Sequence, residues 1–225
     1  METDDDLITG PVSGWRLMGG GIFDFDEPRL FARLAPVAIA EWVDRGAHNM
    51  EHRSWDWVTS VAEPLQSVCL VNDAHTETPA PDCGCGYRLC TEFDDLEAYV
   101  RRMAGKGDHF VVARVETVGT LRASHARAGA QLDGPLDDPA STVRSEAIRI
   151  TDLFLHQDTH DKDAYGSPAA WVEQFGSEAK VHVPPEPRRV MWRPRPGGPE
   201  ELNYVEHLGL EGWLEWIAAD EEASA

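Results

Sequence analysis

The run Phe-Val-Val-Ala-Arg-Val at residues 110–115, taken with a second apolar run at residues 144–155, decides the fold. The first run is rich in β-branched residues, and in the second Ile148 and Ile150 alternate with polar residues. Both features are typical of β-strands. We therefore expect the two runs to form a long hairpin. The Ala-, Gly-, Asp- and Pro-rich residues 122–142 between them are expected to be an extended or mobile insertion.

A helix is predicted on each side of this hairpin. The pattern Thr91-x-x-Asp94 resembles a capping box, and apolar residues recur after it at helical spacing until Gly105. Near the C-terminus, four apolar residues stand at i, i+3, i+4 and i+7, namely Leu210, Trp213, Leu214 and Ile217. This spacing indicates an amphipathic helix that docks on the core, and an acidic tail at residues 220–222 is expected to follow it.

The N-terminal part is expected to begin the sheet and then to turn helical. After an acidic leader, residues 14–17, Gly-Trp-Arg-Leu, are predicted to form the first strand. The glycine run at residues 19–21 is predicted to end this strand, because glycine is conformationally too free to continue it. Pro28 is then expected to open a helix with three apolar residues on one face, Leu30, Phe31 and Leu34.

These elements together predict an α+β fold with a curved, mostly antiparallel sheet and two or three helices, rich in loops and braced by zinc. A length of 225 residues suffices for one sizeable domain or two small ones, and a 42% hydrophobic fraction suffices for a core. We expect an acidic leader at residues 1–13, a zinc-braced α+β domain at residues 14–155, and a C-terminal extension at residues 156–225 that packs on it.

The charge of the chain restricts its partners. Forty Asp and Glu against 20 Lys and Arg give a formal charge of −20, which argues against direct nucleic-acid binding. No run approaches the roughly 18 apolar residues of a membrane helix, and the acidic start lacks the features of a secretory signal. We therefore expect a cytoplasmic protein without a membrane partner. The one basic patch is expected to pair with the protein's own acidic surface and comprises Arg188, Arg189, Arg193 and Arg195 beside Trp192.

All four cysteines lie in one segment between positions 69 and 90. In a reducing compartment such a cluster favours a metal site or a redox pair over a disulfide framework. Glycines at 84 and 86 allow a tight turn that would aim two of the thiolates at one point. Three thiolates and one imidazole complete the tetrahedral shell of a structural Zn(II) site. The predicted ligands are Cys69, His75, Cys83 and Cys85, while Cys90 either replaces His75 or packs into the core.

A second set of metal-binding residue types follows the hairpin. His156, Asp158 and His160 alternate, so an extended strand would place all three on one face, where they could bind Zn, Mn or Fe. A solvated acidic loop is the simpler interpretation of residues 156–163. The sequence contains neither a Gly-x-Ser-x-Gly elbow nor a His-Glu-x-x-His motif.

The order of several short motifs between residues 14 and 155 suggests a relationship. Gly14-Trp15-Arg16 is followed by a tryptophan-containing stretch, Cys69, the pattern His75-x-x-x-Pro79-x-x-x-Cys83-x-Cys85-Gly86, and a strand pair ending at Arg144-x-Glu146-Ala147. This order resembles a group of uncharacterised actinobacterial and phage-associated proteins. The chain departs from them at Tyr87-Arg88 and in the hairpin insertion. The resemblance implies a shared fold and metal site and carries no activity with it.

The sequence thus predicts a non-enzymatic binding protein with a structural zinc site and a protein partner. Fixing a loop residue costs about 1–2 kcal/mol, whereas a structural zinc ion supplies on the order of 10 kcal/mol, enough to order a loop-rich segment. One alternative is a metal-dependent hydrolase that uses His156, Asp158 and His160. Another is an acidic protein that mimics nucleic acid and inhibits a basic partner.

Overall fold

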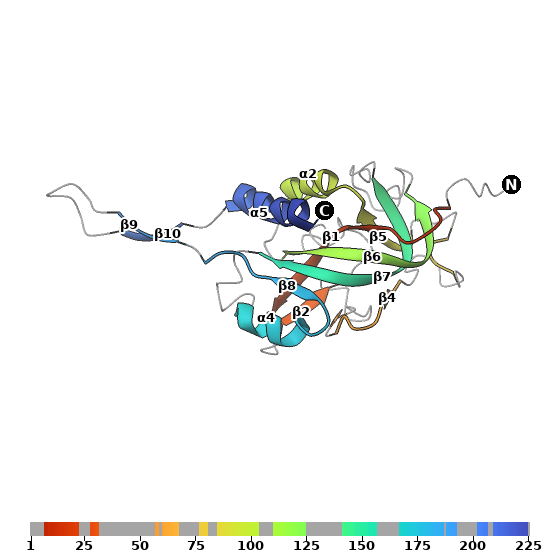
Figure 1. Ribbon diagram of the computed structural model, residues 1–225, viewed down its shortest axis with the longest axis horizontal. Coiled ribbons are helices and arrows are strands. Elements are labelled where there is room, and N and C mark those ends of the chain that lie inside the picture. The colour runs from red at the N-terminus through yellow and green to blue at the C-terminus, as the bar shows by residue number, and fades with distance from the viewer. Residues whose placement is uncertain are drawn as a thin grey trace, which may run out of the picture.

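The computed structural model describes residues 7–22, 28–31, 57–58, 60–67, 77–80, 85–103, 110–124, 141–156, 167–186, 188–192, 202–206 and 209–224. These residues form an eight-stranded sheet, a separate two-stranded sheet and three helices, as Figure 1 shows. All pairings in the large sheet are antiparallel except that of β7 with β8. The predicted α+β class with a mostly antiparallel sheet is therefore confirmed, while the zinc brace stays a prediction.

The predicted hairpin is the centre of the sheet. It consists of β6 (Phe110–Ala123) and β7 (Thr142–Leu155), which pair antiparallel and are both longer than the sequence indicated. The register shifts twice, between Arg114 and Val115 and between Val118 and Leu121. Such irregularities bend a strand and increase its twist. They give the sheet the curvature that its alternating pattern alone does not specify.

Two further strands close this hairpin into a ring. β1 (Ser13–Ile22) pairs with β6, and β5 (Tyr87–Cys90) pairs with both β1 and β7. The order β1, β5, β7, β6 therefore returns to its start. The short strands β3 (Trp57–Val58), β4 (Leu65–Gln66) and β8 (Lys180–His182) extend the sheet beyond the ring.

Two predictions for the N-terminal part were wrong. β1 does not end at the glycine run but continues through residues 19–22, which pair with β2 (Pro28–Phe31). Residues 28–31 are thus a strand where a helix was expected, and Leu30 is fully buried between its neighbours in the core. Pairing of the glycine backbone with β2, and of Gly19 also with β6, outweighs the conformational freedom of glycine. The remainder of the expected helix, including Leu34, lies outside the described residues.

The two helices predicted on either side of the hairpin are confirmed, with one correction at the C-terminus. α2 (Phe93–Met103) occupies the segment after Thr91, whose hydroxyl donates to the Ser141 carbonyl at 3.3 Å. α5 (Gly209–Ser224) includes the expected amphipathic positions, and its acidic residues 220–222 are part of the helix and not a tail after it. α2 and α5 lie on the same face of the sheet (Figure 1) and share one core cluster with Trp15 and Phe154. No described helix is long and apolar enough to span a membrane.

The opposite face of the sheet is covered by a helix that the sequence analysis did not predict. α4 (Pro168–Phe175) begins at Ser167, whose side chain accepts a hydrogen bond from the backbone N–H of Ala170. Trp171 and Phe175 are fully buried against the core of that face. This helix leads into β8, so it forms the crossover that the parallel pairing with β7 requires.

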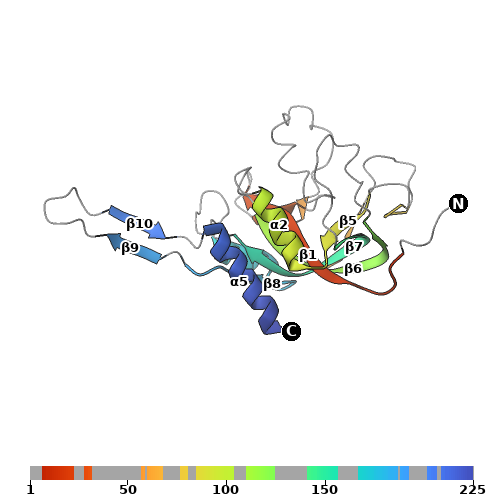
Figure 2. The ribbon, with the colours of Figure 1, turned by 90° about the horizontal axis from the view of Figure 1, so that it is seen from above.

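A two-stranded hairpin projects from this body. β9 (Arg188–Trp192) pairs antiparallel with β10 (Leu202–Glu206), and Figures 1 and 2 both show the pair extending away from the large sheet. We call it the arm. It lies in the chain between β8 and α5. Arg188 and Arg189 of the predicted basic patch are in β9, while Arg193 and Arg195 lie outside the described residues.

Candidate functional site

The structure describes one of the four predicted zinc ligands. Cys85 is buried, and its Sγ accepts a hydrogen bond from the backbone N–H of Ala80 at 3.2 Å. Arg144 donates through Nη1 to the carbonyl oxygens of Ala80 and Cys85, at 3.2 and 3.3 Å. Cys69, His75 and Cys83 lie outside the described residues, so the zinc site stays a prediction.

The spare cysteine is part of the hydrophobic core. Cys90 is buried on β5 in the cluster under α2 and α5, together with Trp15 and Phe93. Its Sγ lies 3.9 Å from Thr142 Oγ1. The structure thus places Cys90 where a small apolar side chain packs well.

The second predicted metal set is also described only in part. The ring of His156 lies edge-on to Trp213 of α5, with centroids 4.7 Å apart. Asp158 and His160 lie outside the described ranges. The hydrolase interpretation of this set therefore stays untested by the structure.

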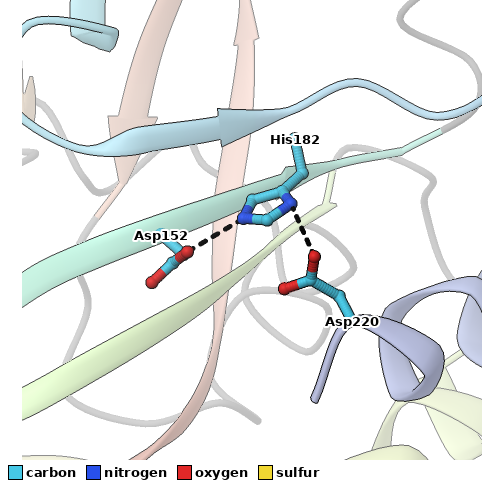
Figure 3. Close-up of side chains that lie close together, drawn as sticks. All are labelled: Asp152, His182 and Asp220. Atoms are coloured by element: carbon cyan, nitrogen blue, oxygen red, sulfur yellow. Dashed lines mark hydrogen bonds and ion pairs between the residues drawn. The ribbon is translucent and has the colours of Figure 1, made fainter. Parts of the chain in front are cut away.

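The structure brings together a different set, Asp152, His182 and Asp220, shown in Figure 3. His182 Nε2 lies 2.8 Å from Asp152 Oδ1, and His182 Nδ1 lies 3.5 Å from Asp220 Oδ1. One possible ligand atom from each residue lies within 4.8 Å of the others. Within the described ranges this is the one group of three or more His, Cys, Asp or Glu side chains with such a geometry. We call it the His182 centre.

Strand pairing places two members of this centre. β8 pairs with β7 so that His182 stands opposite Phe154, and the two rings stack with centroids 4.0 Å apart and an angle of 14°. Side chains alternate between the faces of a strand, so Asp152 lies on the same face as Phe154, two residues along. The stacked ring therefore keeps the imidazole beside that carboxylate.

Helix docking places the third member. α5 is held on the sheet by its buried apolar side and by Trp213, whose Nε1 donates to the carbonyl of Leu155 at 2.9 Å. Ile217 is fully buried one turn before Asp220. Residues three apart share a helix face, so docking of Ile217 turns Asp220 toward the sheet. The third carboxylate thus follows from the amphipathic pattern of α5.

The centre is largely enclosed and rich in charge. The side chains of His182, Asp152 and Asp220 are 7%, 14% and 27% exposed. Lys180 Nζ lies 3.7 Å from Asp220 Oδ1. Burial raises the pKa of Asp152, but hydrogen bonds from His182 and Thr151 and attraction to His182 and Arg114 lower it more, so that the carboxyl titrates below its ordinary range. Asp152 is consequently an anion at neutral pH.

This arrangement can act in two ways. Two carboxylates and one imidazole are ligand types for divalent ions such as Mn²⁺, Fe²⁺ or Zn²⁺. Without an ion, an imidazole that faces a carboxylate at each nitrogen links three elements of the fold. Both roles would tie α5 to β7 and β8.

Sequence reasoning missed all three residues of the centre. Asp152 offered a weak signal, as an acidic residue inside a strand between Ile150 and Leu153. Asp220 was interpreted as part of an acidic tail after the helix, and His182 lies in a segment for which no strand was predicted. Their proximity depends on where α5 docks and on the parallel pairing of β8. The amphipathic spacing predicted that α5 docks on the core but not beside which strands, and no local pattern predicted the pairing of β8.

No protein-family model, curated protein or solved structure matches the chain. The resemblance to actinobacterial and phage-associated proteins therefore stays a prediction. A functional assignment has to rest on the geometry of the His182 centre and on its position in the fold.

Proposed function

We propose that this chain is a non-enzymatic binding protein that takes up one divalent cation at Asp152, His182 and Asp220. The observation that carries the proposal is the convergence of three ligand atoms within 4.8 Å from β7, β8 and α5. Metal bonds of about 2.0–2.2 Å place two ligand atoms at most about 4.4 Å apart. A small inward movement of the side chains would therefore close them around an ion.

The burial of the centre favours a holding role over turnover. A catalytic metal needs an open coordination position that a substrate can reach. The three side chains here are at most 27% exposed, and the ring of Phe154 covers one side of the imidazole. An ion in this position would instead fix β7, β8 and α5 relative to one another.

The position of the centre in the chain suggests what it would fix. His182 ends β8, which leads into the arm, and Asp220 belongs to α5, which follows the arm. A cation bound to both would fasten the two segments that flank the projecting hairpin. We infer that the arm is the surface presented to a protein partner, because its backbone extends away from the sheet (Figure 2).

Binding of Mn²⁺ to the full-length chain tests the proposal. Mn²⁺ suits carboxylate and imidazole ligands and is a poor ion for a cysteine-rich site, so the two predicted metal sites are distinguished. Titration followed by electron paramagnetic resonance should show one Mn²⁺ per wild-type chain. The Asp220→Asn variant should lose at least about tenfold in affinity, in the range seen when a ligand environment is damaged.

A matched control comes from the same helix. Glu215 is exposed on α5, so Glu215→Gln removes an equal charge without touching the centre. Equal Mn²⁺ affinity of wild type, Asp220→Asn and Glu215→Gln would contradict the proposal, since the ion would then bind to the general acidic surface.

The predicted structural zinc site is a second part of the proposal. The buried Cys85 Sγ accepts a backbone N–H, and Arg144 brings a guanidinium to the same loop; both features favour a thiolate. Zinc analysis should give about one ion per chain more for wild type than for Cys83→Ser. Cys90→Ser is the control, because loss of zinc in that variant would instead make Cys90 a ligand.

A further inference from the structure

Arg16 is a buried cation on β1 with an incomplete set of partners. Its side chain is 1% exposed. Nη1 donates to the carbonyl of Arg88, whereas Nε is buried and has no hydrogen-bond partner among the residues that the structure describes. The guanidinium lies over the ring of Tyr87, with Cζ 5.2 Å from the centroid. A buried N–H without a partner is rare in folded proteins, and an ion or water held at that point is a common reason for it.

The charge on Arg16 persists at neutral pH. Burial lowers its pKa to about 10, with Arg88 adding repulsion and with Tyr87, Tyr99 and Cys90 acting in the opposite direction. None of the groups that act on this pKa is an aspartate or a glutamate. Tyrosine and cysteine are ordinarily neutral at pH 7. Among the described residues, then, no carboxylate balances this cation.

The surroundings of Arg16 increase the cost of leaving it unbalanced. Its backbone pairs with Ala113 of β6, and its neighbours on that face belong to the hydrophobic core, including Met18 and Leu89. Arg88 is also buried, and its positive charge lowers the pKa of Arg16 further. Apolar neighbours cannot offset a charge, and breaking or omitting one partner of a buried ion pair is strongly unfavourable.

We propose that a small oxyanion, bound through Nε of Arg16, completes this part of the core. The planar guanidinium offers parallel N–H donors that match two oxygens of a carboxylate or a phosphate, which a monatomic anion cannot engage in the same way. Arg88 supplies additional positive charge. This site is separate from the His182 centre, and it would hold an ion of opposite sign.

Thermal unfolding of the full-length protein tests this inference. Wild type would be dialysed into a zwitterionic buffer and heated with sodium phosphate, sodium acetate or sodium chloride at matched ionic strength. A ligand that binds only the folded chain raises the unfolding midpoint as its concentration increases. We expect the unfolding midpoint to rise more with phosphate or acetate than with chloride. Whether phosphate or acetate gives the larger rise identifies the class of oxyanion.

Two variants establish where the anion acts. Arg16→Met replaces the cation by an apolar chain of similar length, so its midpoint without added anion should equal or exceed that of wild type, and the oxyanion response should vanish. Arg149→Met removes an exposed arginine from β7 and should keep the full response. Equal responses of wild type and Arg16→Met, or a response to chloride as large as to the oxyanions, would overturn the inference.

A direct measurement covers the case in which Arg16→Met fails to fold. Extensively dialysed wild type would be denatured and the released anions separated by ion chromatography. One phosphate or carboxylate per chain supports the site. Absence of any retained oxyanion, together with a midpoint that does not change with phosphate or acetate, refutes it.

Discussion

The His182 centre and the surroundings of Arg16 bury charge in opposite ways. In the first, an imidazole lies between carboxylates contributed by β7 and α5, so polar groups from three elements meet one another. In the second, Arg16 directs its guanidinium at a backbone carbonyl, and no carboxylate among the described residues faces it. A chain with twice as many acidic as basic residues thus buries an arginine that no described carboxylate balances. Net charge says little about which sign is buried.

The largest loss of stability is expected at the His182 centre, where the imidazole contacts carboxylates directly. His182→Ala leaves Asp152 and Asp220 facing each other without the imidazole and removes the stack on Phe154. The free energy of unfolding should fall by about 3 kcal/mol, the cost of stranding buried charge. Urea denaturation at pH 7 with a chelator present measures it. Lys180 is an exposed neighbour on β8, so Lys180→Ala should lower the free energy of unfolding by less than about 1 kcal/mol. Equal losses for the two variants would contradict a special contribution of the His182 centre.

An intermediate effect is expected where arginine meets carbonyls. Arg144→Met removes the two hydrogen bonds to the loop that contains Cys85. Hydrogen bonds to charged groups contribute about 1.5–3 kcal/mol each, and the methionine recovers part of the packing, so a loss of about 2 kcal/mol is expected. Hydrogen exchange should accelerate at residues 85–87. Unchanged exchange there would mean that the arginine does not order this loop.

A smaller loss of stability is expected for an uncharged contact, which serves as a reference for the two charged regions. Ser167→Ala removes the side chain that caps α4, which belongs to neither region. The expected loss is about 1 kcal/mol, and Ser167→Asp should restore most of it, because aspartate caps equally well. Wild type and the two variants are compared by the urea concentration at the midpoint of unfolding. Failure of the aspartate to restore stability would show that the hydroxyl matters for something other than capping.

The smallest effect concerns an exposed carboxylate and appears only in acid. Hydrogen bonds from the Val61 backbone and from Ser60 lower the pKa of Glu178 below its ordinary value of 4.5. A carboxyl with a lowered pKa stabilises the fold above its unfolded-state pKa, and that stabilisation disappears as the pH falls through the folded-state pKa. Wild type should therefore unfold at a slightly higher temperature than Glu178→Gln at pH 7. This gap should close below about pH 4.5, and a constant gap across the acid range would contradict the assignment.

Local patterns in the sequence were sufficient for part of the fold. The alternation in residues 144–155 and the spacing from Leu210 to Ile217 predicted a strand and a helix that the structure contains. α5 buries Trp213, Leu214 and Ile217 at helical spacing, whereas β7 is buried on both faces along most of its length and alternates only around the exposed Arg149. Residues 28–31 were mistaken for a helix because a short apolar run fits both periods. Pairing with β1 on one side and with the more distant β3 on the other makes them a strand.

Such local patterns could not predict the candidate site, for a related reason. Its members stand at positions 152, 182 and 220, and each belongs to a different element. Clustering along the chain drew attention to Cys83 and Cys85, whereas the His182 centre is clustered only in space. A charged residue at a strand position flanked by buried apolar ones, as at Asp152, was the one local sign that a partner from elsewhere had to exist.

The ring of strands also constrains the order of events during synthesis. Ser13 of β1 pairs with Glu116 of β6, and β5 joins β1 to a strand that ends only at Leu155. As the chain leaves the ribosome, residues 19–22 can pair with β2 at once, whereas the first half of β1 emerges without its main partner β6, which follows about a hundred residues later. The edge groups of this first half and Trp15 must remain shielded meanwhile, so nascent chains stalled before β6 should be the species that chaperones capture most strongly.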